Sequence, residues 1–403
     1  MNSIESISKH LKVKISTSTI SNDIFTEKAC FCLYDTKNRL KRRQLIRNVC
    51  SNRKRINIVR FFHAIFSRCI AFVNFFFHSL FLHQTATILS VSAKTLNIHP
   101  LKDEIKLGQV GGVATSIKDK NELFIFHRGS REWNQYSFPD GIHFNRNQFG
   151  PIPEKTILNV NSQTGEIINQ WGNNTFYMPH GLSIDYQGNF WLTDVAMHQV
   201  FKYSKDKLVL TLGELFVPGD DSTHFCKPTD VAISNTGEDI YVADGYCNSR
   251  IVKFDSKGKF IKQYRMPVGE KQLLIPHSLV LIESLQLICV ADRENRRIVC
   301  FNTKTNEGKV KFIIEHPSIK TIYAITYNSN KNHLYAVSGK NQMMEAVGYT
   351  FSTNLDSFGK LLSIWKPQEK FGEPHDLTLS VDGQALFVGE IRPNLIRLFN
   401  NLD

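Results

Sequence analysis

A repeated segment occurs six times in the chain, and this repeat restricts the fold more than any other feature of the sequence. Each copy contains three or four short apolar strands separated by turn residues, which is typical of the blades of a β-propeller. Successive copies start 69, 49, 48, 46 and 52 residues apart, and the long first interval contains an insertion near residues 131–153. The first apolar positions of the copies are Val113, Leu182, Val231, Leu279, Ile325 and Leu377. The sequence predicts an all-β fold, a six-bladed β-propeller, closed by a strand from around residues 95–107 that joins the last blade.

The residue two positions before each of these apolar positions is histidine in alternate copies. The six residues at this place are Gly111, His180, Thr229, His277, Tyr323 and His375. Alternate blades of a six-fold ring lie about 120° apart, so three imidazoles at the start of the innermost strands converge on the axis. A single histidine at such a place is usually a hydrogen-bonded structural residue, but three at one repeat position favour a metal. Three neutral imidazoles that leave a fourth position open are typical of catalytic zinc.

The turns between the second and third strands of a blade lie on the same face of the disc as these histidines, because the strands are antiparallel. Arg128, Tyr246 and Arg293 occupy such turns. A guanidinium suits a carboxylate substrate, since it can donate two parallel hydrogen bonds. A tyrosine beside a cation and a zinc ion can have its pKa lowered and serve as a general base. Arginine and tyrosine in turns are also ordinary surface residues, so each is weak support alone.

The chain has 403 residues and a formal net charge of +12, and this charge belongs almost wholly to its N-terminal part. Residues 1–93 contain 15 Lys+Arg and 4 Asp+Glu, whereas the rest of the chain contains 34 basic and 33 acidic residues. A body that is nearly neutral argues against nucleic-acid binding. We therefore predict two parts, a basic and hydrophobic targeting segment at 1–93 and a propeller at 94–403.

The targeting segment contains a mostly apolar stretch at residues 61–82, and all of its basic residues lie at or before Arg68. The stretch resembles the apolar core of a secretory signal and is a poor transmembrane helix, because its length is marginal and it contains polar residues. The small residues at 91–93 could serve as the cleavage site of this signal. The segment is either a signal peptide with an extended start or a signal-anchor, and membrane contact is expected only through it. A buried helix of a soluble domain and a mitochondrial signal are weaker alternatives.

Cysteine usage supports export to the secretory pathway. Four of the eight cysteines lie before residue 70, and the other four are Cys226, Cys247, Cys289 and Cys300. An even number in an exported body suggests two disulfides, and four cysteines permit three connectivities. Asn173 begins an N-glycosylation sequon, which matters only if the body is lumenal or secreted.

Longer motifs resemble those of the peptidyl-α-hydroxyglycine α-amidating lyases, which are propellers with NHL-like repeats. The resemblance extends from about Gly108 to Phe399. Its motifs are F-H-R-G at 126–129, P-H-G-L-S-I-D at 179–185, W-L-T-D-V-A-M-H-Q-V-F-K at 191–202, F-C-K-P-T-D-V-A at 225–232, D-G-Y-C-N-S-R-I-V at 244–252, V-A-D-R-E-N at 290–295 and P-H-D at 374–376.

This resemblance implies a role for individual residues. It implies zinc bound by His180, His277 and His375, Tyr246 as the general base, and Arg128 and Arg293 lining the site. It implies a structural calcium ion held by the backbone carbonyls of Val113 and Leu182 and the carboxylate of Asp376. It also implies disulfides that join Cys226 to Cys247 and Cys289 to Cys300.

The resemblance implies a zinc-dependent lyase that cleaves the N–Cα bond of a C-terminal peptidyl-α-hydroxyglycine, giving a peptide amide and glyoxylate. Glu373 departs from the family pattern, which usually has Met there. This carboxylate could ligate zinc, contact or repel the substrate carboxylate, or point to solvent. Nothing in the sequence resembles a copper-dependent hydroxylating domain. We expect a monomer with only the lyase activity, whose substrate a separate copper hydroxylase supplies.

Two other functions fit a propeller. A calcium-dependent lactonase or esterase would present acidic and amide ligands from several blades, whereas these repeats present histidines. A non-catalytic NHL-type propeller that binds protein or RNA would have a basic rim and no metal triad.

Overall fold

The computed structural model of the chain describes residues 87–99, 106–305, 308–340, 345–400 and 402, and its regular structure is almost entirely β-strand. The strands are β1 (Ile88–Val91), β2 (Lys94–Leu96), β3 (Val110–Thr115), β4 (Glu122–His127), β5 (Ile157–Asn161), β6 (Ile167–Trp171), β7 (Pro179–Ile184), β8 (Phe190–Asp194), β9 (Gln199–Ser204), β10 (Lys207–Leu212), β11 (Pro228–Ile233), β12 (Asp239–Asp244), β13 (Arg250–Asp255), β14 (Phe260–Tyr264), β15 (Pro276–Ile282), β16 (Leu287–Asp292), β17 (Arg297–Asn302), β18 (Val310–Ile314), β19 (Ile322–Asn328), β20 (His333–Ser338), β21 (Gly348–Ser352), β22 (Leu361–Pro367), β23 (Pro374–Leu379), β24 (Ala385–Glu390) and β25 (Leu395–Asn400). Two short 3-10 turns, Glu283–Leu285 and Leu355–Ser357, complete the described elements.

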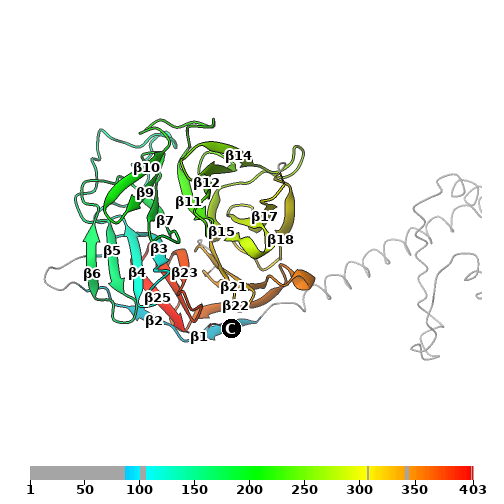
Figure 1. Cartoon of the computed structure of the whole chain (residues 1–403). Coiled ribbons are helices and arrows are strands. Elements are labelled where there is room, and N and C mark those ends of the chain that lie inside the picture. The colour runs from blue at the N-terminus through cyan, green and yellow to red at the C-terminus, as the bar shows by residue number, and fades with distance from the viewer. Residues whose placement is uncertain (1–86, 100–105, 306–307, 341–344, 401, 403) are drawn as a thin grey trace, which may run out of the picture. The chain divides into compact units, whose positions relative to one another are not determined.

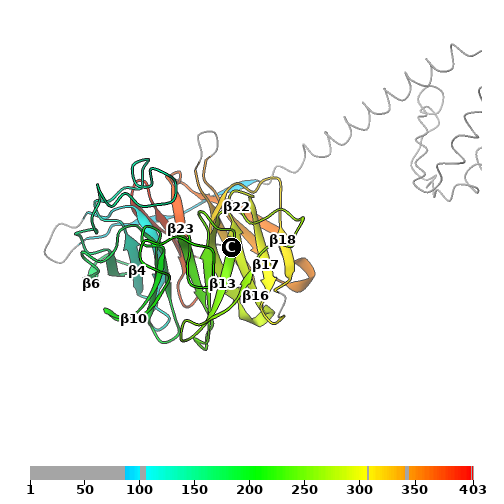
Figure 2. The same ribbon diagram turned by 90° about the horizontal axis from the view of Figure 1, so that it is seen from above.

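These strands form six sheets, which Figure 1 shows arranged around a central axis and Figure 2 shows from a second direction. Five blades start with β3, β7, β11, β15 and β19, and each continues outward through the next three strands of the chain. The sixth blade starts with β23 and contains β24 and β25. The predicted six-bladed propeller is confirmed, and all six predicted apolar positions lie in the first strands of their blades.

The ring closes with a strand from the N-terminal side of the propeller. Strand β2 pairs antiparallel with β25, so that Lys94 lies opposite Leu398 and Leu96 opposite Ile396. The predicted closing strand is therefore present, at the beginning of the expected range. An additional strand, β1, was not predicted; it pairs parallel with β22 and adds a fifth strand to the fifth blade. This strand lies before residue 94, where the propeller was predicted to start.

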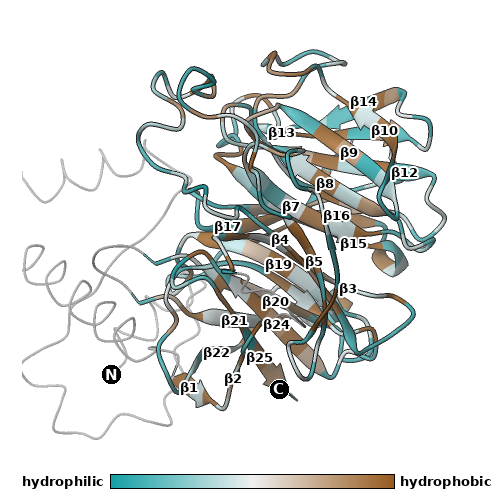
Figure 3. Ribbon diagram, turned by 90° about the vertical axis from the view of Figure 1, so that its left-hand side faces the viewer, coloured by the Kyte–Doolittle hydropathy of each residue, from teal (hydrophilic) through white to brown (hydrophobic). Residues whose placement is uncertain are grey.

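The blades adhere because both faces of their inner strands are apolar. In β12, Ile240 and Val242 pack against the preceding blade, and Tyr241 and Ala243 pack against the following blade. This follows from the period of two, which sends successive side chains to opposite faces of a sheet. Each pair of neighbouring blades encloses one apolar cluster in this way. In Figure 3 the apolar residues follow the strands, while the connecting loops are mostly polar.

Several predictions concern residues outside the described part of the chain. These include the apolar stretch at 61–82 and the four cysteines before residue 70. Residues 91–93, the predicted cleavage site, are described and lie at the end of β1 and just after it. Among the described residues, no helix has the length and apolar character needed to cross a membrane.

Candidate active site

Three histidines from alternate blades meet at one end of the central channel. His180 comes from β7, His277 from β15 and His375 from β23. Their ring centroids lie 4.7 to 4.9 Å apart, and one ligand atom of each lies within 4.8 Å of those of the other two. All three side chains are buried. The convergence expected from the repeat register is present, and the cluster could hold a metal ion.

A backbone carbonyl of the intervening blade orients each imidazole. The Nδ1 atoms of His180, His277 and His375 lie 2.7, 2.6 and 2.9 Å from the carbonyl oxygens of Thr229, Tyr323 and Gly111. These acceptors occupy the same repeat position in the other three blades. A carbonyl only accepts, so each Nδ1 carries the proton and each Nε2 lone pair is free to bind a metal. This donor set fits a zinc ion with an open coordination position.

The three imidazoles are neutral over the ordinary pH range. Burial lowers the pKa of His375 to about 3, and the nearby Arg128 contributes in the same direction. Burial and the neighbouring histidines hold the pKa values of His180 and His277 well below the usual range. Neutral imidazole is the form that ligates a metal.

Tyr246 lies against this cluster. Its hydroxyl oxygen is 2.9 Å from Nε2 of His180 and 3.2 Å from Nε2 of His277. Since both nitrogens are acceptors, the single phenolic proton can be donated to only one of them at a time. Burial raises the pKa of Tyr246, while Arg293 and Arg128 act to lower it.

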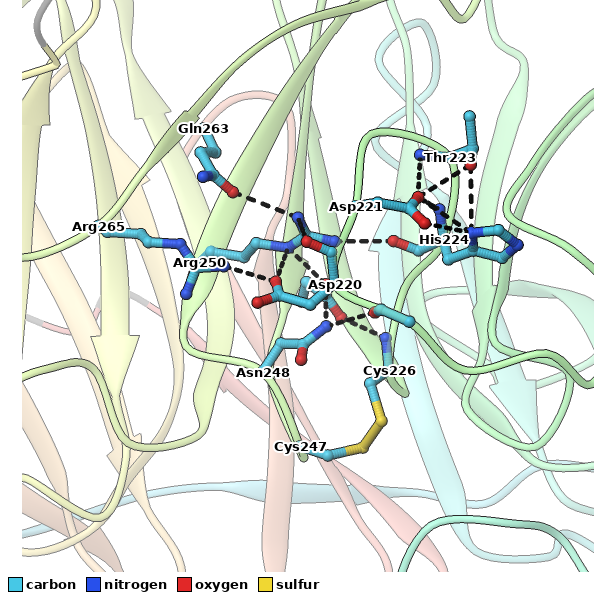
Figure 4. Close-up of polar contacts among 12 residues, drawn as sticks. Asp220, Asp221, Thr223, His224, Cys226, Cys247, Asn248, Arg250, Gln263 and Arg265 are labelled. Atoms are coloured by element: carbon cyan, nitrogen blue, oxygen red, sulfur yellow. Dashed lines mark hydrogen bonds and ion pairs between the residues drawn. A yellow bond between two sulfur atoms is a disulfide. The ribbon is translucent and has the colours of Figure 1, made fainter.

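The turn that carries Tyr246 is fixed by a buried polar network, shown in Figure 4. The carboxylate of Asp244 accepts hydrogen bonds from the backbone N–H of Cys226, from Asn248 at 2.7 Å and from Arg250 at 2.8 Å. The disulfide between Cys226 and Cys247 ties the same turn to the preceding loop. The motif D-G-Y-C-N-S-R is thus a device that positions the tyrosine. The second implied disulfide, Cys289–Cys300, is also present and joins β16 to β17.

Arg128 reaches the site from the end of β4. Its Nε donates to the carbonyl of Pro179 at 2.9 Å, and its Nη1 donates to Oε1 of Gln109 at 2.8 Å. Its Nη2 is buried and has no partner among the described residues. Burial lowers the pKa of Arg128 to about 10, so the guanidinium remains charged at neutral pH. A buried donor without an acceptor is costly, which indicates that a ligand oxygen belongs there.

Arg293 lies between the aromatic rings of Tyr246 and Tyr323. Its guanidinium carbon is 5.4 Å from the ring centroid of Tyr246 and 4.8 Å from that of Tyr323. Its Nε also donates to Glu294 at 2.9 Å. Burial lowers the pKa of Arg293, but the nearby tyrosine hydroxyls and Glu294 outweigh it, so the net shift is upward.

Arg128, Tyr246, Arg293 and one of the three histidines, His375, line one cavity of about 270 Å³. The lining residues are Gln109, Arg128, Trp133, Tyr246, Arg293, Tyr323, His375, Ile391 and Arg392. Trp133 comes from the insertion at 131–153, and its ring lies 4.8 Å from that of Tyr246. No role was predicted from the sequence for Gln109, Trp133, Tyr323 or Arg392. Two of them had a signal in the sequence. The long first repeat interval indicated the insertion that contains Trp133, and Tyr323 occupies the repeat position of the histidines.

Glu373 is not among the cavity-lining residues. Its carboxylate is 3.4 Å from the guanidinium of Arg392, which does line the cavity. Its side chain is 30% exposed. This ion pair was not among the roles predicted for the carboxylate.

The residues expected to hold calcium lie on three neighbouring blades. The backbone N–H of Val113 in β3 donates to Oδ2 of Asp376 in β23 at 2.8 Å, and β3 packs closely against the backbone of Leu182 in β7. Burial and the nearby carboxylate of Asp230 raise the pKa of Asp376 well above its usual range. Burial raises the pKa of Asp230 to about 7. Two buried carboxylates close together suit a divalent cation. Asp230 was not predicted from the sequence.

Asn173 is exposed in the turn after β6, and the hydroxyl of Thr175 donates to its backbone carbonyl at 3.1 Å. The sequon is therefore accessible to a modifying enzyme.

Comparisons with known proteins agree with this geometry. Residues 176–203 and 225–254 match the NHL repeat model. Peptidyl-alpha-hydroxyglycine alpha-amidating lyase 2 of Drosophila melanogaster is 38% identical over 72% of this chain and 71% of its own length. A Caenorhabditis elegans protein named "probable peptidyl-alpha-hydroxyglycine alpha-amidating lyase" is 40% identical over 72% of this chain and 82% of its own length.

The chain also matches larger proteins and more distant folds. It is 43% identical to the peptidylglycine alpha-amidating monooxygenase of Rattus norvegicus, over 72% of this chain but only 30% of that protein. Hydrazine synthase of Kuenenia stuttgartiensis shares the fold, with a TM-score of 0.50, 12% identity, and coverage of 76% of this chain and 80% of that one. From the two relatives that it matches over most of their length, the chain belongs to the family of peptidyl-α-hydroxyglycine α-amidating lyases.

Proposed function

We propose that this protein is a zinc-dependent lyase that cleaves the N–Cα bond of a peptide ending in α-hydroxyglycine, giving a peptide amide and glyoxylate. One arrangement carries the proposal: the hydroxyl of Tyr246 lies 2.9 Å from Nε2 of His180, in a cavity that also contains Arg128 with its free Nη2. The substrate bears a hydroxyl and a carboxylate on the same carbon. A base and a buried guanidinium close together suit that pair of groups.

The three histidines would hold the zinc ion, and their proton arrangement supports this role because every Nε2 is an acceptor. Zinc bound there would polarise the α-hydroxyl of the substrate and lower the pKa values of that hydroxyl and of Tyr246.

Arg128 binds the substrate carboxylate. Two of its donors are already used by Pro179 and Gln109, which fix the plane of the guanidinium and direct the unpaired Nη2 to the ligand. A donor held in this way needs no rearrangement when the substrate binds. Arg293, stacked on the ring of Tyr246, stabilises negative charge on the phenolic oxygen.

With the metal bound, Tyr246 would start as the phenolate, stabilised by Arg293, and it takes the proton of the α-hydroxyl. The electron pair of the O–H bond forms the carbonyl of glyoxylate, and the N–Cα electron pair leaves with the amide nitrogen. That nitrogen receives the proton, so the tyrosine is regenerated and the reaction consumes neither water nor an oxidant. The wall formed by Trp133 beside Tyr246 limits the access of bulk water to the proton.

A structural calcium ion fits the channel beneath the site. The ligands would be the backbone carbonyls of Val113 and Leu182 and the carboxylate of Asp376, and the nearby buried carboxylate of Asp230 adds negative charge that a divalent cation would offset. We propose that this ion joins blades one, two and six.

The substrate comes from a separate enzyme that hydroxylates the α-carbon of a C-terminal glycine. Two disulfides and an exposed sequon at Asn173 support an oxidising, secretory compartment for both.

The proposal is tested with the purified full chain and a peptide that ends in α-hydroxyglycine. We expect peptide amide and glyoxylate in equal amounts, at a rate above that of the spontaneous reaction. A calcium-dependent hydrolase or a propeller that only binds a partner would release neither product. If the folded, metal-loaded protein gives no product, the proposed reaction is wrong.

A further inference from the structure

A third arginine stands at the mouth of the cavity. Arg392 lies in the turn between β24 and β25 and lines the cavity together with Ile391. Its side chain is 56% exposed, whereas Arg128 and His375 are only 1% and 3% exposed. The cavity therefore runs from a closed end at Arg128 to an open end at Arg392.

The backbone around Arg392 is fixed to the segment that carries His375. The N–H of Glu373 donates to the carbonyl of Arg392 at 2.7 Å, and the N–H of Ile391 donates to the carbonyl of Glu373 at 2.9 Å. His375 follows Glu373 by two residues, so these bonds fix the position of the Arg392 backbone relative to the histidines. Only the side chain of Arg392 is left to adapt to a ligand.

All ionised residues that line the cavity are arginines, namely Arg128, Arg293 and Arg392. Arg293 is engaged by Glu294 at 2.9 Å and by two aromatic rings. The carboxylate of Glu373 is 3.4 Å from Arg392, which is long for a charge-assisted hydrogen bond. Arg392 is therefore attracted to an anion and only weakly satisfied by its own neighbour.

The direction in which the substrate lies follows from the proposed function, on which this inference rests. With the terminal carboxylate at Arg128 and the α-hydroxyl at Tyr246, the peptide leaves the cavity through its open end. One residue of extended chain covers about 3.3–3.6 Å, so the residue immediately before the α-hydroxyglycine lies near the mouth.

We propose that Arg392, partly neutralised by Glu373, makes the protein select the residue before the terminal α-hydroxyglycine by charge. An acidic side chain at that position is preferred, a neutral one is intermediate and a basic one is disfavoured. Glu373 sets the strength of this preference, because it screens the guanidinium from the substrate.

The test compares kcat/KM for three peptides that differ only at this residue, which is Glu, Gln or Lys. A charge pair that remains partly in solvent changes affinity modestly. We therefore expect kcat/KM for the Glu peptide to be about three- to tenfold higher than for the Lys peptide, mainly because its KM is lower. This ratio should be smaller at high salt. Arg392→Gln lowers the ratio to one or below, because the carboxylate of Glu373 then remains without its cation. Glu373→Gln increases it. These opposite changes distinguish direct recognition from a general loss of structure.

Lys120→Gln is the matched control. Lys120 forms an ion pair with Asp382 at 3.9 Å, between the β3–β4 turn of the first blade and the β23–β24 turn of the sixth, at the other end of the strands from Arg392. Removal of this cation should leave the Glu-to-Lys ratio unchanged.

The affinities of the corresponding peptides ending in plain glycine, measured by calorimetry, provide a readout that needs no turnover. The same order, Glu above Gln above Lys, is expected, together with its loss in Arg392→Gln. If no peptide yields glyoxylate, the proposed reaction fails, and these affinities still decide the charge preference. If the wild-type protein treats all three residues alike in both measurements, or if Arg392→Gln keeps the wild-type ratio, the inference is wrong.

Discussion

The hydroxyl of Tyr246 lies 2.9 Å from Nε2 of His180, the nitrogen that a metal ion would occupy, because Nδ1 of the same ring donates to the carbonyl of Thr229. Tyr246→Phe removes this hydroxyl and leaves all three imidazoles and their carbonyl partners in place. We predict that kcat falls about 10²- to 10⁴-fold, the usual contribution of a general base, while bound zinc per chain is unchanged. Steady-state kinetics and metal analysis of the same preparation check this. A variant with near-normal kcat would mean that another group takes the proton.

Arg128→Lys should weaken substrate binding. A lysine cannot keep the bonds to Pro179 and Gln109 and also offer a third donor in the same plane. We expect kcat/KM to fall about 10- to 100-fold, the size of one lost charge-assisted hydrogen bond. Arg131→Lys is the control, since Arg131 stacks on Phe149 and does not line the cavity. Equal effects of the two substitutions would contradict the carboxylate assignment.

The two disulfides should differ in what their loss does to activity. Replacing Cys226 and Cys247 by Ser releases the turn that carries Tyr246, so both stability and kcat should fall, kcat by about tenfold or more. Replacing Cys289 and Cys300, which join β16 to β17 away from the cavity, should lower stability by a similar amount, about 3 kcal/mol. It should leave kcat within about twofold. Urea unfolding measures stability, and kcat is measured under conditions in which each variant is folded. If the two double variants lose kcat equally, the Cys226–Cys247 bridge does not position Tyr246.

The stability of the propeller should fall in mild acid because of His127. Its Nδ1 accepts hydrogen bonds from the backbone N–H groups of Gly108 and Gly129, both at 3.1 Å, and burial lowers its pKa to about 4. Since the folded pKa lies below the unfolded value of about 6.5, the unfolded chain binds more protons between these values. The contribution is fully present above pH 6.5 and is lost as the pH falls toward 4, by about 3 kcal/mol at most.

Urea unfolding from pH 7 to pH 4.5 measures this effect. His127→Asn retains an acceptor for the two N–H groups but cannot be protonated, so its stability should depend less steeply on pH. If the variant keeps the slope of the wild-type protein, His127 is not the group responsible.

The repeat pattern was sufficient to predict the propeller and the convergence of the histidines. The period of the repeat fixes the angle between blades, so a residue type at one repeat position has a defined place in space. His180, His277 and His375 are close for this reason, although about 100 residues separate each from the next. Tyr246 and the arginines were located by the same register.

Contacts that the repeat does not encode were missed. Strand β1 pairs parallel with β22. Its four residues lie outside the repeats, so no repeat position indicates which strand they pair with. Trp133 belongs to an insertion, whose path is not set by the repeat. The pairing of Glu373 with Arg392 depends on the local path of one turn, and Asp230 was overlooked because only its position in the channel makes it unusual.

The rate of glyoxylate release as a function of zinc bound per chain shows whether the three-histidine site catalyses the lyase reaction. The chain is stripped with a chelator that leaves calcium in place and is then titrated with zinc. We predict that the rate rises in proportion to bound zinc and levels off when one ion per chain is bound, while His277→Ala neither retains this ion nor gains activity. A rate that does not depend on zinc, or a folded protein that binds one ion per chain without releasing glyoxylate, would mean that zinc at these histidines does not catalyse the reaction.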